Sequence, residues 1–402
     1  MRNKVSLSTQ TLPLIHLFCH MACAFIAALN SMGGLNLENV ESFVEMASSS
    51  SDGSSKPFFD RCKLPITVKD DCDAFVRSRY SGPIRPAPFQ GYCSYTLFVG
   101  EEIAVQFRPF AYKLDISMTR TACDIFKRLA PETEYLGQLK GTDLHAFSMR
   151  KLPGVSLVDY RAMTSNRSAR EQMVRDFARL QALAWRNAKP VQGLLGEKRT
   201  VGSSLTLRLE LMSASLPMRF RRTASAILDD ISEIEALPWV FTHGDFLGAN
   251  IMVDPYSGTL TGLLDWAEAE WLPFGIGMYG LEELLGEDNQ SGRFVYYPEA
   301  KHLRNLFWKH LIVLLPELER DSKTIALVKK AQRFGVLLWH GIAFDDGNLN
   351  RVVEEGRDDR EIQRLSVFLS RTSSTPQSKL QKIGASMSSP LSLIRGFRLG
   401  KV

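Results

Sequence analysis

The sequence has few cysteines, and they form neither a metal-binding nor a disulfide pattern. Six are spread over 402 residues, at Cys19, Cys23, Cys62, Cys72, Cys93 and Cys123. None of their spacings matches the paired ligands of a zinc site, and a disulfide framework needs more cysteine in a smaller secreted chain. Only Cys62 and Cys72 are arranged as a plausible local pair. We therefore expect reduced thiols that are mostly buried.

The body of the chain also lacks an excess of charge of either sign. The formal net charge is +5, from 49 basic and 44 acidic residues. Five of the basic residues and no acid lie after Thr372, so the rest of the chain has 44 of each. A nucleic-acid-binding protein is expected to show a basic face within its folded part, and nothing here requires one. The Ser-rich, basic tail predicts disorder.

Long apolar runs are absent apart from one, at residues 12–29, which Pro13, His16 and His20 interrupt. Its layout imitates a secretory signal, and it is barely long enough to span a membrane. A buried or loosely attached leader is the alternative, as is a start codon assigned too early. The Ser/Gly-rich stretch at 48–55 predicts a flexible linker.

What is present is a body large enough for two lobes, since 45% of the residues are hydrophobic. Alternating apolar residues predict a first sheet, with strands at 95–99, 103–107, 133–139 and 144–149. Apolar residues at helical spacing predict helices at 70–80, 118–129, 169–188, 204–212, 224–234, 279–285, 301–315, 325–342 and 358–370. The sequence thus predicts a sheet-rich part followed by a mainly helical remainder.

Polar residues concentrate between 241 and 271, where folding alone does not require them. A short apolar strand leads into the triplet His243-Gly244-Asp245, and Asn250 follows five residues after the aspartate. These residue types are also common in turns and caps, so an ordinary hairpin is the alternative interpretation.

The next two strands bring a second aspartate back towards the first. Residues 251–253 and 259–264 predict strands joined by a turn-rich connection. The hairpin that they form ends at Asp265, so we expect its carboxylate to lie near Asp245 and Asn250. An aspartate that receives a hydroxyl proton, beside two oxygen ligands for magnesium, suits phosphoryl transfer from a nucleotide.

The spacing H-x-D-x-x-x-x-N matches the catalytic loop of kinases. The stretch resembles the aminoglycoside phosphotransferase and choline kinase group, and most closely fungal phosphotransferase-like proteins. The resemblance implies that Asp245 is the catalytic base and that His243 braces the loop. It also implies that Asn250 and Asp265 bind Mg²⁺, with ATP or GTP as the phosphoryl donor.

The same resemblance implies an α+β, bilobal protein kinase-like fold. A small β-rich N-lobe is expected at 56–150 and a mainly helical C-lobe, with the acceptor site, at 151–371. Residues 1–55 would be a leader and linker, and 372–402 a disordered tail. An enzyme that uses ATP is expected in the cytoplasm; a secretory or membrane-anchored form through residues 12–29 is the alternative. The resemblance covers about three quarters of the chain but is specific mainly at 241–275.

The family's phosphate-pairing lysine on the third strand is missing. Gln106 and Arg108 share one face of that strand by alternation, and either is a candidate for its place. Arg108 retains a charge that can grip phosphate oxygens. Asp124 on the next helix is the candidate partner of Arg108, with a solvated charge as the alternative. The pattern around Met149 and Lys151 resembles the hinge whose backbone groups meet adenine.

Seven acids and no Lys or Arg lie between residues 265 and 288, namely Asp265, Glu268, Glu270, Glu282, Glu283, Glu287 and Asp288. Such a wall of one sign can attract a cationic acceptor, or it is a solvated helical face. Glu268 is the member closest in sequence to the chemistry, and it is the candidate substrate contact.

These patterns predict an ATP- and Mg²⁺-dependent phosphotransferase that acts on a hydroxyl of a small molecule. The missing lysine motivates an alternative, a catalytically silent pseudokinase that binds nucleotide or a protein partner. Transfer to protein hydroxyls ranks last, because the Asp-Phe-Gly and Ala-Pro-Glu marks of protein kinases are absent and residues 265–267 read Asp-Trp-Ala.

Overall fold

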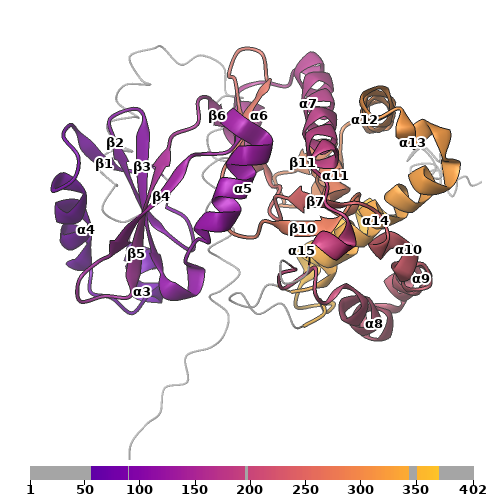
Figure 1. The fold of residues 1–402 in the computed structure, drawn as a ribbon, viewed down its shortest axis with the longest axis horizontal. Coiled ribbons are helices and arrows are strands. Elements are labelled where there is room, and N and C mark those ends of the chain that lie inside the picture. The colour runs from indigo at the N-terminus through magenta and orange to yellow at the C-terminus, as the bar shows by residue number, and fades with distance from the viewer. Residues whose placement is uncertain (1–55, 89, 195–197, 344–350, 371–402) are drawn as a thin grey trace, which may run out of the picture. The chain divides into compact units, whose positions relative to one another are not determined.

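The computed structural model describes residues 56–88, 90–194, 198–343 and 351–370. The apolar run, the Ser/Gly-rich stretch and the basic tail discussed above lie outside these ranges. The described residues form a sheet-rich N-terminal part and a mainly helical remainder (Figure 1). None of the helices in these ranges is both long and apolar enough to cross a lipid bilayer.

The N-terminal part is built on one antiparallel sheet in the order β1-β2-β3-β5-β4. Its strands are β1 (Ile84–Pro86), β2 (Tyr95–Val99), β3 (Ile103–Pro109), β4 (Thr133–Gln138) and β5 (Leu144–Arg150). Apolar residues alternate along β2 and β3, so one face of the sheet is buried. Helices α3 (Lys56–Arg61) and α4 (Val68–Arg77) pack on that face and complete a small core.

Helix α5 (Ile116–Phe126) belongs to a second, larger core. Its residues Ala122, Ile125 and Phe126 pack with the helical remainder rather than with α3 and α4. The ring of Phe126 lies 5.1 Å from that of Trp266, which follows the second aspartate of the motif. The large core therefore connects α5 directly to the candidate site.

The helical remainder is organised around α7 (Arg167–Arg186). Its apolar spacing buries Met173, Phe177 and Leu180, as the sequence predicts. The side chain of Asn166 caps the helix by accepting the N–H groups of Ser168 and Ala169, an arrangement that stabilises a helix by about 1 kcal/mol. The other helices are α6 (Leu157–Met163), α8 (Leu205–Ser215), α9 (Met218–Leu228), α10 (Ile231–Glu235), α11 (Gly280–Leu284), α12 (Ala300–Leu314), α13 (Glu317–Arg320), α14 (Ser322–Gly341) and α15 (Asp359–Leu369).

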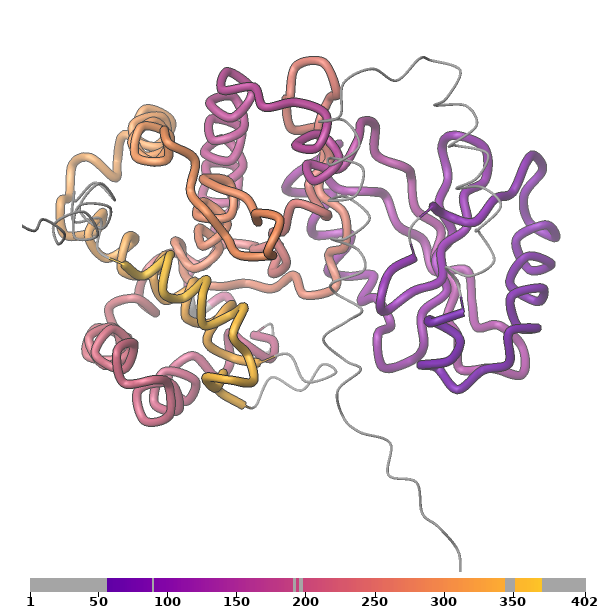
Figure 2. The backbone as a smooth tube through the Cα atoms, turned by 180° about the vertical axis from the view of Figure 1, so that it is seen from behind, coloured from indigo at the N-terminus to yellow at the C-terminus, as the bar shows by residue number. Residues whose placement is uncertain are grey.

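Small sheets carry the polar motif and its surroundings. They comprise β6 (Val155–Ser156), β8 (Ile251–Val253) and β9 (Leu260–Leu263) in one sheet, β7 (Trp239–Thr242) with β10 (Glu270–Pro273), and β11 (Gly286–Asp288) with β12 (Phe294–Tyr296). Helix α15, yellow in Figure 2, packs along α14. Its arginines reach α11 and β11, which follow the motif in sequence.

Most predicted elements are confirmed to within a few residues, including the β8–β9 hairpin. Two predictions need correction, and one strand was missed. The helix expected at 224–234 is two helices, α9 and α10. Strand β10 was not predicted, although it is the partner of β7. Of the four cysteines in the described ranges, all are free thiols but only Cys72 is buried, so the expectation of mostly buried thiols is wrong there.

Candidate active site

The loop that carries the motif starts at the end of the fully buried strand β7. The Nε2–H of His243 donates to the carbonyl oxygen of Leu264 over 2.7 Å, and its Nδ1 accepts the N–H of Asp245 over 3.2 Å. Burial lowers the pKa of the imidazole to about 4, so the ring is neutral and keeps this tautomer. His243 therefore joins the start of the loop to the residue just before Asp265.

Gly244 is required by both backbone conformation and space. Its φ is +80°, which favours glycine. A Cβ atom at this position would lie 2.2 Å from the carbonyl oxygen of Glu268, far inside van der Waals contact. The glycine thus lets the loop pass close to the segment that follows Asp265.

Asp245 and Asn250 are in direct contact, as the motif predicts. The Nδ2 of Asn250 donates to Oδ2 of Asp245 over 2.7 Å and to its backbone carbonyl over 3.1 Å. The short helix η4 (Gly248–Asn250) returns the asparagine to the aspartate. Both side chains remain partly exposed, so they face an accessible space.

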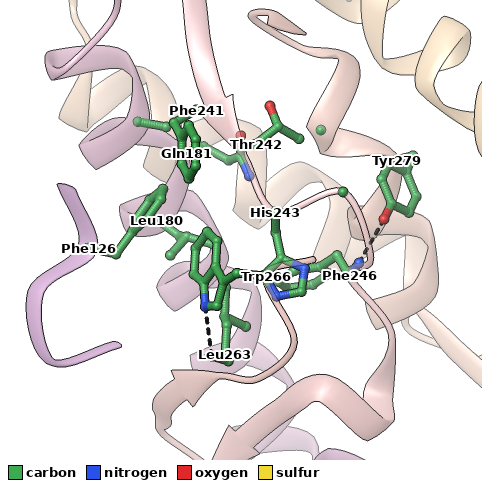
Figure 3. A pocket seen from close by; sticks show the side chains of 13 residues that line it. Phe126, Leu180, Gln181, Phe241, Thr242, His243, Phe246, Leu263, Trp266 and Tyr279 are labelled. Atoms are coloured by element: carbon green, nitrogen blue, oxygen red, sulfur yellow. Dashed lines mark hydrogen bonds between the residues drawn. The ribbon is translucent and has the colours of Figure 1, made fainter. Parts of the chain in front are cut away.

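Asp265 lies at the end of the β8–β9 hairpin in the left-handed region, with a φ of 56°. Aspartate tolerates this conformation better than most residues, and such backbone strain is common at functional sites. Its Oδ1 accepts the Nη2–H of Arg108 over 2.9 Å. The adjacent Trp266 is buried; its ring packs against His243 and Phe241, and its Nε1–H donates to Leu263 (Figure 3). The tryptophan thereby fixes the turn that presents Asp265.

Carboxylates crowd around the motif and alter each other's acidity. Burial, and then the charges of Glu268 and Asp265, raise the pKa of Asp245 to about 8. Loss of solvent, and then the charge of Asp265, raise the pKa of Glu268 to about 7. The three acids therefore create a negative site that is relieved by a proton or by a cation.

Arg108, the candidate for the place of the missing lysine, is buried beside Asp265. It is 2% exposed, and its Nε–H donates to Oε1 of Gln106 over 3.0 Å, so the two residues share a face as predicted. The guanidinium reaches Asp265 from the sheet of the N-terminal part. The pairing proposed with Asp124 is wrong, because Asp124 is an exposed residue of α5 and Arg108 bonds to Gln106 and Asp265 instead.

The expected hinge needs a partial correction. Met149 lies within β5, paired with Ala104 on one side and Thr133 on the other. The Lys151 N–H donates to the carbonyl of Glu102 over 2.7 Å, so it is not available to a nucleotide base. The first N–H beyond β5 with no hydrogen bond to the described residues is therefore further along the chain, at Leu152.

A loop between β1 and β2 approaches the same acids. The side chain of Gln90 is fixed to the strand, since it donates to the carbonyl of Thr96 and accepts the Thr96 N–H. Burial raises the pKa of the neighbouring Cys93 thiol to about 11, with Asp265 and Glu268 among the charges that act on it. Sequence reasoning gave no role to Cys93.

The acidic segment 265–288 is not an open negative wall. Both carboxylate oxygens of Glu283 accept hydrogen bonds from Arg364, which also bonds to Asp288. Arg360 lies 2.6 Å from Asp288, and His340 lies 3.3 Å from Glu283. Arginines of α15 therefore neutralise these two acids. Burial opposes ionisation of Glu283, but the contact with His340, and then the charge of Arg364, lower its pKa.

Two other acids of the segment are also engaged. Glu282 is buried and accepts hydrogen bonds from Arg304 and from the Tyr296 hydroxyl. Glu270 is buried and accepts the N–H of Gly202 over 2.7 Å. The hypothesis of a wall that attracts cations is therefore wrong for these members, because distant residues already satisfy their charge. Glu268 keeps its position beside Asp245 and Asp265.

Beneath the loop lies a cavity of about 20 Å³, lined by residues that include Gln181, Thr242 and Tyr279 (Figure 3). It has room for about one water molecule and not for a substrate. The hydroxyl of Tyr279 accepts the N–H of Phe246, the residue after Asp245, over 2.7 Å. Sequence reasoning missed this support because Tyr279 lies more than thirty residues away and belongs to no motif.

Residues 91–275 match the model of the phosphotransferase enzyme family, APH. This part of the chain is similar to that family. A solved GDP complex of wild-type aminoglycoside 2'-phosphotransferase-IIIa is 13% identical over 68% of this chain and 90% of that chain, with a TM-score of 0.47. An aminoglycoside 3'-phosphotransferase of type VIII is 14% identical over 66% and 98%, with a TM-score of 0.41.

A third structure, an aminoglycoside phosphotransferase from Streptomyces rimosus, is 13% identical over 66% of this chain and 98% of that chain, with a TM-score of 0.41. No curated protein matches the chain. The matched residues include both Cys93 and the motif at 241–271. The match over residues 91–275 agrees with the resemblance expected from the sequence. The α+β class, with a sheet-rich N-terminal part and a mainly helical remainder, is confirmed.

Proposed function

We propose that the protein transfers the terminal phosphoryl group of a nucleoside triphosphate, ATP or GTP, to a hydroxyl of a small molecule. The observation that carries this proposal is the contact between Asp245 and Asn250 beside Asp265. Three oxygen-bearing side chains from two segments converge there, and the phosphotransferase-family match spans all of them. Phosphoryl transfer depends mainly on such placement and on charge neutralisation.

In the proposed reaction the acceptor oxygen forms a bond to the terminal phosphorus. The bond between that phosphorus and its bridging oxygen breaks, and the nucleoside diphosphate leaves. Asp245 receives the proton of the acceptor hydroxyl. Arg108 neutralises phosphate charge in place of a lysine, and Gln106 holds the guanidinium in position. The backbone near Leu152 takes the place first assigned to Lys151 for contact with the base.

The donor set suits Mg²⁺. Asn250 offers an amide oxygen, and Asp265 offers a carboxylate that is 35% exposed; hard oxygen ligands and few protein donors are what this ion prefers. Burial, and then the charge of neighbouring acids, raise the pKa of Asp245 and Glu268; a divalent cation would relieve the repulsion between these acids. When bound, Mg²⁺ supplies positive charge that neutralises the phosphates. Asp245 is then held in the ionised form that a base requires.

The test is nucleotide-dependent release of ADP or GDP across a panel of alcohols, with wild-type protein and the Asp245→Ala variant. We expect turnover to fall by about 100- to 10,000-fold in the variant, which is the usual contribution of a general base, while Mg²⁺-dependent nucleotide binding persists. Unchanged turnover in Asp245→Ala would contradict the assigned role.

A silent, nucleotide-binding protein is the second candidate, and the Arg108–Asp265 ion pair favours it. The guanidinium occupies one oxygen of the proposed metal ligand. Thermal stabilisation by Mg²⁺ and nucleotide without consumption of nucleotide, across the full panel, is the result expected of this candidate.

A further inference from the structure

Helix α6 carries an arginine, Arg161, that makes no ion pair with a carboxylate of the described residues. The Nη2–H of Arg161 donates to the backbone carbonyl of Glu283 over 3.0 Å. This is its only hydrogen bond to the described residues, none of which places a carboxylate within ion-pair distance of it. Arg304 and Arg364, in the same region, each make at least two bonds to carboxylates. Arg161 therefore has an unused guanidinium edge, and it is partly exposed.

Arg161 lies beside the loop that carries the proposed base. Gly248, three residues after Asp245, comes so close that a Cβ atom there would be 3.7 Å from Nη1 of Arg161. Glu283 connects the two sides, because its carbonyl accepts from Arg161 while its carboxylate charge acts on Asp245. Glu283 of α11 therefore interacts with both groups, the guanidinium of Arg161 on α6 and the carboxylate of Asp245.

The acidic residues near Arg161, Glu282 and Glu283, already form ion pairs with other arginines. The carboxylate of Glu283 is held by Arg364, and that of Glu282 by Arg304. An arginine with a free edge recognises a carboxylate or phosphate through two parallel hydrogen bonds. We propose that the acceptor is an alcohol that also carries an anionic group, bound by Arg161 while its hydroxyl lies at Asp245. This inference rests on the proposed function and names the class of its acceptor.

A cationic alcohol is the competing occupant. Glu287 is the acid that favours it, since it is exposed and its bond among the described residues is to the Tyr297 hydroxyl, over 2.9 Å. A single exposed carboxylate that already accepts a hydrogen bond is a weaker anchor than an unpaired guanidinium beside the loop. Cationic alcohols therefore belong in the test as the class expected to bind poorly.

Binding, rather than turnover, separates this inference from the proposed function. The full chain with Mg²⁺ and ADP is titrated with matched probes by calorimetry: glycerate against glyceramide, 4-hydroxybutyrate against 4-hydroxybutyramide, glycerol 3-phosphate against glycerol, and choline and kanamycin as cations. We expect the anionic member of at least one pair to bind about 10- to 100-fold more tightly than its neutral partner. The glycerate and glycerol 3-phosphate arms distinguish carboxylate from phosphate.

Variants of Arg161 test whether its guanidinium causes the preference for anionic probes. Arg161→Gln is expected to abolish the anion preference, and Arg161→Lys to retain part of it because the charge remains but the planar fork is lost. Arg186→Gln is the matched control, since Arg186 also makes a single bond to a backbone carbonyl, that of Leu314, over 3.1 Å; it should leave the preference unchanged. Nucleotide affinity should be the same in all four proteins.

Three results would overturn the inference: no anionic probe binds, the preference survives in Arg161→Gln, or cationic alcohols bind most tightly. A loss of nucleotide affinity in Arg161→Gln would also overturn it, because Arg161 would then belong to the nucleotide site. If Arg161→Gln does not fold, the comparison is made with Arg161→Lys. Failure of the proposed function would show itself separately, as absence of Mg²⁺-dependent nucleotide binding in the wild-type protein.

Discussion

Replacing Asp245 by asparagine should stabilise the metal-free protein while removing its activity. Asp245 is surrounded by Glu268 and Asp265, and burial together with these charges raises its pKa to about 8 from 3.8. An asparagine keeps the size and a hydrogen-bond acceptor for Asn250 but carries no charge. The substitution therefore relieves a repulsion that the protein maintains for function, the usual basis of a trade-off between stability and activity.

The direction of the expected change in stability with pH follows from proton binding by Asp245. Between pH 4 and 8 the folded state keeps the proton on Asp245, whereas the unfolded state loses it, so the wild-type protein becomes less stable as pH rises through this window. Asparagine does not titrate, and its advantage should grow over the same window. The difference in pKa sets an upper limit of about 6 kcal/mol. Because Asp245 is partly exposed, solvent screening reduces this to about 1–3 kcal/mol at pH 8.

The assay is urea and thermal unfolding at pH 5, 6, 7 and 8 in the presence of a chelator. We expect Asp245→Asn to melt about 3–8 °C higher than wild type at pH 8 and close to it at pH 5. Asp254→Asn is the control of opposite sign, because the Ser257 N–H lowers the pKa of Asp254 in an exposed turn. An Asp245→Asn protein that is less stable than wild type at pH 8 would refute the reasoning.

Three further substitutions test the site. Gly244→Ala should cost at least about 2 kcal/mol in urea unfolding and abolish turnover, since its Cβ would overlap the Glu268 carbonyl at a positive φ; retention of both would contradict the geometry. Arg364→Met should cost about 3–5 kcal/mol by leaving Glu283 buried without its main partner; a change below about 1 kcal/mol would show that the pair is not critical. Arg108→Gln should raise the nucleotide Kd about 10- to 100-fold in titration calorimetry, while Arg108→Lys should retain most affinity; equal loss in both would show that charge is not what matters.

The motif could be predicted from the sequence because its geometry is local. Asp245 and Asn250 are five residues apart, and the β8–β9 hairpin that returns Asp265 is closed by a short turn. Strand β10 was missed because its partner is β7, beyond the whole loop and hairpin, so nothing in its own four residues reveals the pairing.

The nucleotide side was only partly predictable. Alternation along β3 places Gln106 and Arg108 on one face whatever the rest of the fold does, and the structure shows them in contact. The partner of Arg108 depends on how α5 and the hairpin pack, and alternation carries no information about that. Asp124 is close to Arg108 in sequence, whereas Asp265 is 157 residues away.

The charge of segment 265–288 was misread for the same physical reason. A run of acids predicts a negative surface only if no cation from elsewhere reaches it. Arg364 is 81 residues from Glu283 and Arg360 is 72 residues from Asp288, and they arrive only because α15 packs back along α14. Burial of an acid at such a place requires a partner, so each neutralised carboxylate is a consequence of packing. The charge that remains for a ligand is therefore a property of the folded surface, and in this region Arg161 is an arginine without an ion pair to the described carboxylates.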